Sequence, residues 1–195
     1  MQNGGVSSHD APIPGSTKGQ LLVATPPLAD PNFDRTVVYM LEHHDDGAVG
    51  VVLNRPTPHE LPDGIARWEP HLSSPRVLFE GGPVALDALI ALARVEAPDD
   101  DVWSPVVGDL SSVDLALDPG LVAEGVHSLR VFRGYSGWGA QQLEGELAEG
   151  AWMVLPAAAD DVFCLEPSNL WRAVLRRQGG RVAWVANAPD DLSSN

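Results

Sequence analysis

A serine in a glycine-rich stretch, GYSGW at residues 134–138, is the first candidate for a catalytic nucleophile. In the G-x-S-x-G elbow of α/β-hydrolases, a strand leads into a sharp turn that raises the serine, and a helix follows. Trp138 stands where the last glycine of that motif allows close packing. All six histidines precede Ser136, whereas the hydrolase order places one after it, so only a different geometry with His127 stays open. We therefore predict a glycine-rich turn between a strand and a helix, with Trp138 packed or used in recognition.

A run of metal-ligand residue types occurs at His43, His44, Asp45 and Asp46. Neighbouring side chains of an extended strand point to opposite faces, so the two histidines would not converge on one ion. We predict an acidic turn with surface histidines at this position. No metal, cofactor or catalytic residue is predicted for the chain.

A second glycine turn, with Gly81 and Gly82, lies in the sequence EGGP at residues 80–83. Its backbone N–H groups could face an anion, but the turn lacks the Lys-Ser/Thr end of a P-loop, and Glu80 would repel a phosphate. We expect these glycines to let the chain turn or approach a neighbouring segment closely.

Asn54 and Arg55 stand at the end of an expected strand. An arginine offers a rigid fork of donors to a carboxylate, which makes Arg55 a candidate for binding. The alternative, which we prefer, is that Arg55 pairs with Glu80 or Glu144 within the protein.

The chain is strongly acidic, with 27 Asp and Glu against 12 Lys and Arg and a formal net charge of −15. Nonspecific affinity for nucleic acids depends on neutralising phosphates with basic residues, so direct nucleic-acid binding is disfavoured. Arg172, Arg176 and Arg177 lie close together on an expected helix. We interpret them as compensating its C-terminal dipole in preference to forming a local basic patch.

The remaining features indicate a cytoplasmic protein. The single cysteine, Cys164, cannot form an intrachain disulfide, and no apolar run approaches the length of a membrane span. Residues 1–18 lack the basic region and the apolar region of a signal peptide, and we expect them to form a disordered leader. One domain is expected over 19–188, with a small subdomain as an alternative, and a frayed tail over 189–195.

Apolar and β-branched segments alternate with turn residues along most of the chain. Strands are expected at 20–26, 35–43, 48–54, 76–82, 102–107, 111–117, 127–133, 151–157 and 181–186. Helices are expected after Asp118 and Pro119, over 139–150, and from Ser168 as N-cap to Gly179 as C-cap. Residues 85–95 fit either a helix or a buried strand. Runs of strands without regular βαβ alternation predict an α+β fold.

The sequence resembles the YqgE/AlgH family of small bacterial proteins. The matching stretches are residues 19–56, GGPV at 81–84, GYSGWGAQQLEGEL at 134–147 with Trp152, and DVFCLEPSNLW at 161–171. The resemblance implies an α+β fold on a strongly bent, coiled mixed sheet with flanking helices, and a strand at 88–95. Alanine can replace Ser136 in the family, which a nucleophile would not tolerate. The family has no established biochemical activity and is linked to transcriptional regulation in an alginate context.

These observations predict a non-enzymatic interaction or regulatory protein that acts through a protein partner. The expected binding surface consists of Asn54, Arg55, Gly81, Gly82, Tyr135, Ser136, Trp138 and Gln142. The alternative is a small-molecule-binding protein, or an enzyme of unknown reaction, and it requires these strand-end turns to converge on one pocket. The sequence predicts neither the identity of the partner nor the oligomeric state.

Overall fold

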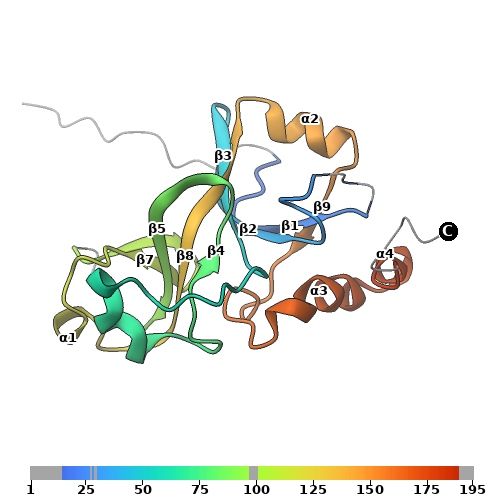
Figure 1. Cartoon of the computed structure of the whole chain (residues 1–195). Helices are drawn as coiled ribbons and strands as arrows, with labels where there is room; N and C mark the ends of the chain where they lie inside the picture. The colour runs from blue at the N-terminus through green and yellow to red at the C-terminus, as the bar shows by residue number, and fades with distance from the viewer. Residues whose placement is uncertain (1–14, 27, 29, 97–100, 189–195) are drawn as a thin grey trace, which may run out of the picture.

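The structure, a computed structural model, describes residues 15–26, 28, 30–96 and 101–188. Nine strands of the described chain form one curled sheet, with β4 attached to β8 and the others in the order β6-β7-β5-β8-β3-β2-β1-β9 (Figure 1). The strands are β1 (Gln20–Ala24), β2 (Val37–His44), β3 (Gly47–Val52), β4 (Phe79–Glu80), β5 (Val84–Val95), β6 (Trp103–Val107), β7 (Leu110–Val113), β8 (Val126–Gly139) and β9 (Trp152–Pro156). The pairings are antiparallel except β4 with β8, so the predicted mixed, bent sheet is confirmed.

The helices are short and lie around the sheet. They are η1 (Asp63–His71), α1 (Pro119–Val122), α2 (Gln142–Ala148), η2 (Pro167–Asn169), α3 (Leu170–Gln178) and α4 (Gly180–Val185). In Figure 1, α1 lies at the end of the molecule opposite α3 and α4, and α2 covers a third side. No helix in the described ranges is both long and apolar enough to cross a membrane.

The long strand β8 belongs to both halves of the sheet. Residues 126–133 pair with β5, Tyr135 pairs with Val84 at the start of β5, and residues 136–139 pair with β3. The change of partner occurs close to Gly134. Its φ of +66° favours glycine, and its Cα lies very near the β4–β5 turn. A Cβ at this position would be 2.6 Å from the Gly82 carbonyl oxygen. The glycine-rich stretch therefore continues the strand, and the predicted turn at this point is wrong.

β1 shows why the N-terminal apolar run folds as a strand. Leu21 and Val23 face the cluster under α3, whereas Leu22 and Ala24 face the cluster under α2. Because both faces are buried, the strand reads as a continuous apolar run without alternation. Its two edges pair with β2 and with β9, so residues 20–24 contact residues 152–156 near the other end of the chain. A third core cluster lies around Trp68 and Leu129.

Local composition predicts some of the elements correctly and misleads at others. Residues 85–95 form β5, which agrees with the family resemblance, because pairing with β7 and β8 outweighs a helical composition. Residues 181–186 are wrong as a strand: Gly179, at positive φ, ends α3, and α4 begins directly at Gly180. Ser168 lies inside η2 and caps nothing, whereas Gly179 is the C-cap of α3 as predicted. Asp118 caps α1, where its side chain accepts from Gly120 N.

The proposed leader and tail fall largely outside the described residues. Residues 1–14 and 189–195 are not described. Thr17 and Lys18, in the expected leader, have defined contacts: the Thr17 N–H donates to His43 Nδ1 at 3.0 Å, and Lys18 Nζ pairs with Glu42 at 3.0 Å.

Candidate functional site

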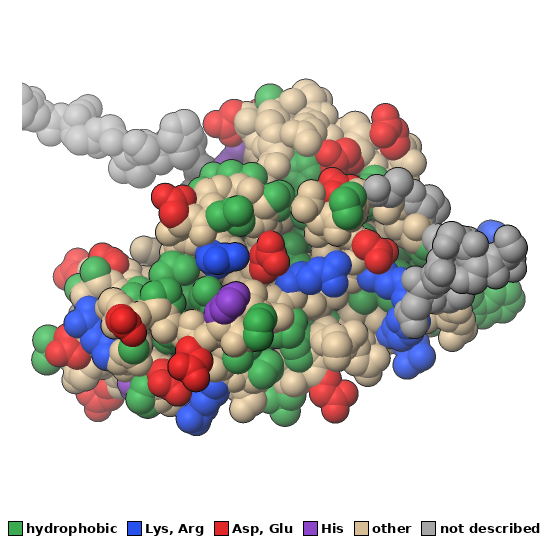
Figure 2. All heavy atoms as spheres, viewed as in Figure 1, with side chains coloured by type: hydrophobic (Ala, Val, Ile, Leu, Met, Phe, Trp, Pro, Cys, Tyr) green, Lys and Arg blue, Asp and Glu red, His purple; other side chains and the backbone are tan. Residues whose placement is uncertain are grey.

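Three arginines that are far apart in the sequence meet at one groove beside α3. Arg35 comes from the loop before β2, Arg55 follows β3, and Arg172 lies in the first turn of α3. We call this cavity of about 330 Å³ the arginine groove; it is lined by Asp34, Arg35, Asn54, Arg55, Pro56, Ser168, Trp171 and Arg172. Figure 2 shows basic side chains gathered across the middle of one face of this acidic protein.

Asn54 fixes the loop that carries Arg35. Its Oδ1 accepts from the Val37 N–H at 2.9 Å, and its Nδ2 donates to the Arg35 carbonyl at 2.8 Å. The side chain is 7% exposed and takes the place of a strand partner for the backbone of residues 35–37. Arg35 has a φ of +51°, a conformation that costs about 1–3 kcal/mol for a non-glycine residue and that surrounding contacts must maintain. Asn54 is therefore a positioning residue of the groove.

Trp171 forms the floor of the groove between two guanidinium groups. The Cζ atoms of Arg35 and Arg172 lie 5.3 and 5.8 Å from its ring centroid, within the range of cation–π attraction. Its indole nitrogen donates to the Ala24 carbonyl at 2.9 Å, which holds the ring in the core. The same two arginines donate to the Ala188 carbonyl at 3.3 and 3.5 Å. An aromatic face flanked by cations is suited to a flat anionic group.

Arg55 lies between the arginine groove and a smaller hollow of about 130 Å³, which Glu80 and Gly82 also line. Its Nη2 donates to the Asp34 carbonyl at 2.5 Å. Glu144 instead contacts His43 Nε2 at 2.9 Å. The preferred expectation that Arg55 pairs with Glu80 or Glu144 is therefore wrong, since in the described chain its side chain binds a backbone carbonyl at the mouth of the groove.

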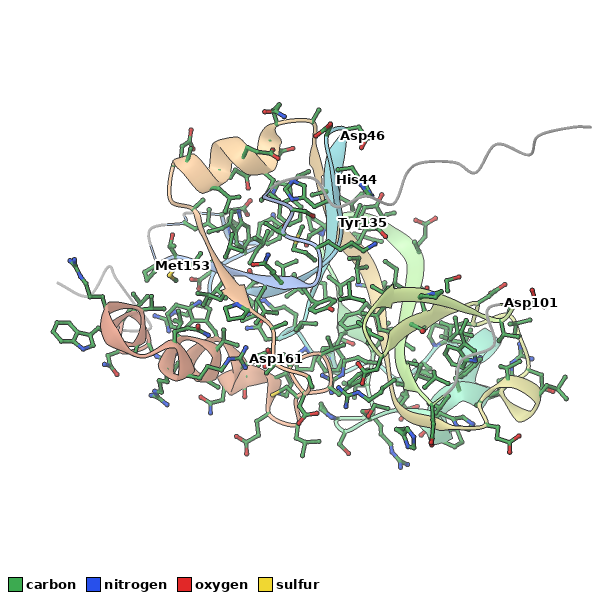
Figure 3. The ribbon with its side chains drawn as sticks, turned by 180° about the vertical axis from the view of Figure 1, so that it is seen from behind. His44, Asp46, Asp101, Tyr135, Met153 and Asp161 are labelled. Carbon is green, nitrogen blue, oxygen red and sulfur yellow. The ribbon has the colours of Figure 1, made fainter. Side chains whose placement is uncertain are left out.

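The turn with Gly81 and Gly82 is buried against β8, and a hydrogen bond connects it to Ser136. Ser136 is fully buried, and its Oγ donates to the Gly81 carbonyl at 3.2 Å, which also accepts from the Val52 N–H at 2.9 Å. A serine on a continuous strand, without exposure, has no access to a substrate. Tyr135 is half-buried where the two halves of the sheet meet (Figure 3). The close approach predicted for the glycines is confirmed.

Trp138 belongs to a different part of the molecule. It is 6% exposed, so of the two alternatives, a packed indole or one used in recognition, the structure shows the packed one. It packs with Phe33 and Trp152, at centroid distances of 6.3 and 5.9 Å, under α2. Gln142 is exposed at the start of α2 and donates to Glu146 Oε1 at 3.0 Å. The predicted residues thus lie in three places: Asn54, Arg55 and nearby Gly82 at the groove; Gly81, Tyr135 and Ser136 where the two halves of the sheet meet; and Trp138 and Gln142 at this aromatic cluster.

Glu146 holds the aromatic cluster through one oxygen. Its Oε2 accepts from the indole nitrogens of both Trp138 and Trp152 at 2.8 Å. We expect Glu146→Ala to lower the free energy of unfolding by about 2–4 kcal/mol, because two buried donors lose their acceptor. Glu146→Gln keeps an acceptor oxygen and should lose less than half as much. Urea denaturation followed by tryptophan fluorescence measures both; equal losses would contradict the assigned role of the carboxylate.

The two imidazoles of the histidine run contact different carboxylates, His43 that of Glu144 and His44 that of Glu42. The described residues contain no cluster of three or more metal-ligand side chains. His43 is buried, whereas His44 is partly exposed near the hairpin tip with Asp46 (Figure 3). The pKa of Glu144 is lowered, first by its own backbone N–H and then by the hydrogen bond from His43. Since Thr17 N–H donates to Nδ1, neutral His43 carries its proton on Nε2 and donates it to Glu144.

Arg35 and Trp171 were not predicted as binding residues from the sequence, and Arg172 was interpreted as compensating the C-terminal dipole of α3. Arg176 and Arg177 do lie in the last turn of α3. Arg177 also forms a two-pronged ion pair with buried Asp161, at 2.6 and 2.5 Å, and this hydrogen bonding raises its pKa. A usable signal was present in the sequence: residues 167–188 contain four arginines and no Asp or Glu. This charge asymmetry in an acidic chain indicates a basic face.

Comparisons with known proteins agree with this fold. Residues 21–183 match the family described as AlgH-like. A UPF0301 protein of Streptomyces avermitilis is 49% identical over 185 residues, covering 92% of this chain and 96% of the relative. A UPF0301 protein of Mycobacterium tuberculosis is 40% identical over 192 residues, covering 96% of this chain and 95% of the relative.

Two solved structures are similar throughout. A crystal structure of a Corynebacterium diphtheriae protein has a TM-score of 0.80 at 28% identity, covering 87% of this chain and 91% of that chain. The solution structure of the AlgH protein from Pseudomonas aeruginosa has a TM-score of 0.68 at 28% identity, covering 98% of this chain and 100% of that chain. With a family match over most of its length and relatives at 40–49% identity, this chain belongs to the AlgH-like family.

Proposed function

We propose that this protein is a non-enzymatic binding protein that acts through a protein partner, engaged at the arginine groove. The observation that supports the proposal is the gathering of Arg35, Arg55 and Arg172 around the Trp171 indole in a chain of net charge −15. A carboxylate of the partner, either a side chain or a C-terminus, offers oxygens to these donor forks. Of the residues predicted to bind, we retain Asn54, Arg55 and Gly82.

The overall charge favours a protein partner over a nucleic acid. A net charge of −15 repels a long polyanion at a distance, whereas one carboxylate on a short segment meets chiefly the local arginines. Any effect on transcription is then indirect, through the partner. We place this activity in the cytoplasm, where the free thiol of Cys164 would stay reduced.

The test reverses one charge at the mouth of the groove. Arg55→Glu should weaken retention of the partner at least about tenfold, which corresponds to about 1.4 kcal/mol. The partner is first identified by crosslinking the purified full chain in cell extract, and its affinity is then measured with purified components. Arg67→Glu is the matched control, because Arg67 lies on η1 and donates to the Ala116 carbonyl at 2.6 Å, away from the groove. Equal affinity of both variants would contradict the proposal.

A second candidate is a small-molecule-binding protein. A cavity of about 330 Å³ with an aromatic floor is within the lower range of ligand sites, which span about 300–1,000 Å³. Native mass spectrometry of gently purified protein distinguishes the two functions. An added mass that disappears in Arg55→Glu would favour an anionic metabolite over a protein.

A further inference from the structure

The helix α4 leads the chain back to the arginine groove. α3 ends at Gly179, yet the Ala188 carbonyl accepts at 3.5 Å from Arg172, which lies in the first turn of α3. The Ala188 N–H donates to the Val185 carbonyl at 3.0 Å, and its side chain packs against the core cluster under α3. The backbone is therefore held at both the N–H and the C=O group of Ala188, and residue 189 follows directly at the groove.

The residues that follow are acidic, with the sequence PDDLSSN at 189–195, which we call the acidic segment. Two residues span at most about 7 Å when fully extended, so the carboxylates of Asp190 and Asp191 cannot reach far from Ala188. Pro189 fixes its own φ and restricts the residue before it to extended conformations, which limits the directions that the segment can take. The two carboxylates are therefore confined to the neighbourhood of the groove.

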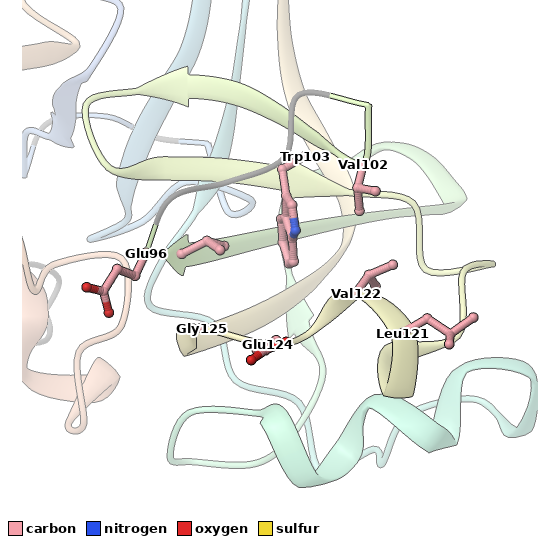
Figure 4. A pocket seen from close by; sticks show the side chains of 8 residues that line it. Glu96, Val102, Trp103, Leu121, Val122, Glu124 and Gly125 are labelled. Carbon is pink, nitrogen blue, oxygen red and sulfur yellow. The ribbon is translucent and has the colours of Figure 1, made fainter.

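The charges that line the groove are complementary to this segment. Three arginines line the groove, against one acidic residue, Asp34. A pocket of about 390 Å³ near α1 has the opposite character: its charged lining residues are Glu96 and Glu124, and apolar side chains make up most of the rest (Figure 4). A pair of aspartates is repelled by such a lining and is attracted to guanidinium forks, which bind carboxylates with two parallel hydrogen bonds. Of these two cavities, the groove fits an acidic segment.

We propose that Asp190 and Asp191 bind in the arginine groove and compete there with the carboxylate of the partner, in place of the frayed tail expected from the sequence. The competition rests on the proposed function, whereas the binding of the acidic segment does not. Because the segment is tethered beside the groove, its effective concentration is on the order of 1 mM or more, and a weak contact suffices to fill the groove. The apparent affinity for the partner is then reduced by the fraction of molecules in which the groove is open.

The first test measures backbone order in the ¹⁵N-labelled full-length chain by NMR relaxation. We expect order parameters of about 0.8 for the amides of Asp190 and Asp191, close to those of rigid backbone. Arg172→Glu and Asp190→Asn/Asp191→Asn should each lower them below about 0.6, the range of flexible segments. The second variant changes only residues beyond α4, so it keeps the test valid if Arg172→Glu does not fold. Arg176→Glu, in the last turn of the same helix and away from the groove, is the matched control and should have no effect. Flexible amides in the unchanged chain, or order that survives both variants, would overturn the proposal.

The second test measures the competition with the purified partner. Asp190→Asn/Asp191→Asn should bind the partner at least about threefold more tightly than the unchanged chain, because the groove is then open in more molecules. Asp45→Asn/Asp46→Asn removes the same charge from the exposed β2–β3 turn and should leave the affinity within about twofold. Equal affinity of the two double variants would overturn the competition, even where Arg55→Glu weakens binding. Unchanged binding in Arg55→Glu would instead contradict the proposed function and leave the measured order of the segment standing.

Discussion

Arg130→Met is expected to lower the free energy of unfolding by about 3 kcal/mol, which corresponds to roughly 6–12 °C in the melting temperature of a chain this long. Arg130 is 1% exposed, and its guanidinium donates to the carbonyls of Val162, Ser74 and Cys164 at 2.8–3.0 Å. It also lies 4.2 Å from the Phe79 ring centroid. Burial lowers the pKa of Arg130 to about 10, so the group still carries its proton at neutral pH. Methionine fills a similar volume but leaves three carbonyls without a donor.

The loss should be local as well as global. Arg130 connects β8 to two loops, the one before β4 and the one before α3, so hydrogen exchange should increase first in residues 161–166. Differential scanning calorimetry and exchange mass spectrometry measure the two effects. Arg67→Met is the matched control, because Arg67 is exposed with a single backbone contact and should change the free energy by less than about 0.5 kcal/mol. A similar loss in both variants would contradict the role assigned to Arg130.

Gly82→Ala is expected to cost about 3–5 kcal/mol, or to prevent folding at physiological temperature, because strain and overpacking add at this position. Gly82 has a φ of +151°, and a Cβ there would lie 2.3 Å from the Tyr135 carbonyl carbon. Backbone atoms cannot rotate away, so the β4–β5 turn would have to separate from β8. That movement would break the hydrogen bonds of the Gly81 carbonyl to Ser136 and Val52, at 3.2 and 2.9 Å.

A glycine in open space separates the two causes. Gly108 has a φ of +61°, and a Cβ there would meet no atom within 4 Å, so Gly108→Ala reports the conformational cost alone, about 1 kcal/mol. Chemical denaturation of both variants gives the difference. If Gly82→Ala were no more costly than Gly108→Ala, the close approach of the turn to β8 would not contribute to stability.

The strands were predictable wherever apolar runs end in strong turn signals. The β2–β3 hairpin follows from Asp45, Asp46 and Gly47, and β9 from its apolar run after Gly150. The sequence was misleading where tertiary contacts outweigh local composition. Residues 134–139 were predicted as a turn because glycine is common in turns. In the structure these residues belong to a strand, and the absence of a side chain on glycine lets a neighbouring backbone segment approach that strand closely. Residues 181–185 are apolar enough for a strand and pack instead as a helix against α3.

The candidate site was predictable only in part. Asn54 and Arg55 were identified from their place at a strand end, and they do line the groove. The sequence did not predict that Arg35 and Arg172 line the same groove. These two residues are 137 positions apart and come together only when the sheet curls and α3 packs against it. Trp138 was misjudged for a related reason: its burial depends on Phe33 and Trp152, from two other parts of the chain. Burial of one residue by distant segments leaves no local pattern.

The pairing of β1 with β9 has a consequence for synthesis of the chain. β1 leaves the ribosome well before β9, yet one of its edges is covered only by residues 152–156. Until these emerge, the unpaired N–H and C=O groups of this largely apolar strand stay open to any other extended chain nearby. At typical translation rates of 5–20 residues per second, this interval lasts on the order of 10 s. We therefore expect the nascent protein to depend on a chaperone at β1 or on an interim intramolecular cover during that time.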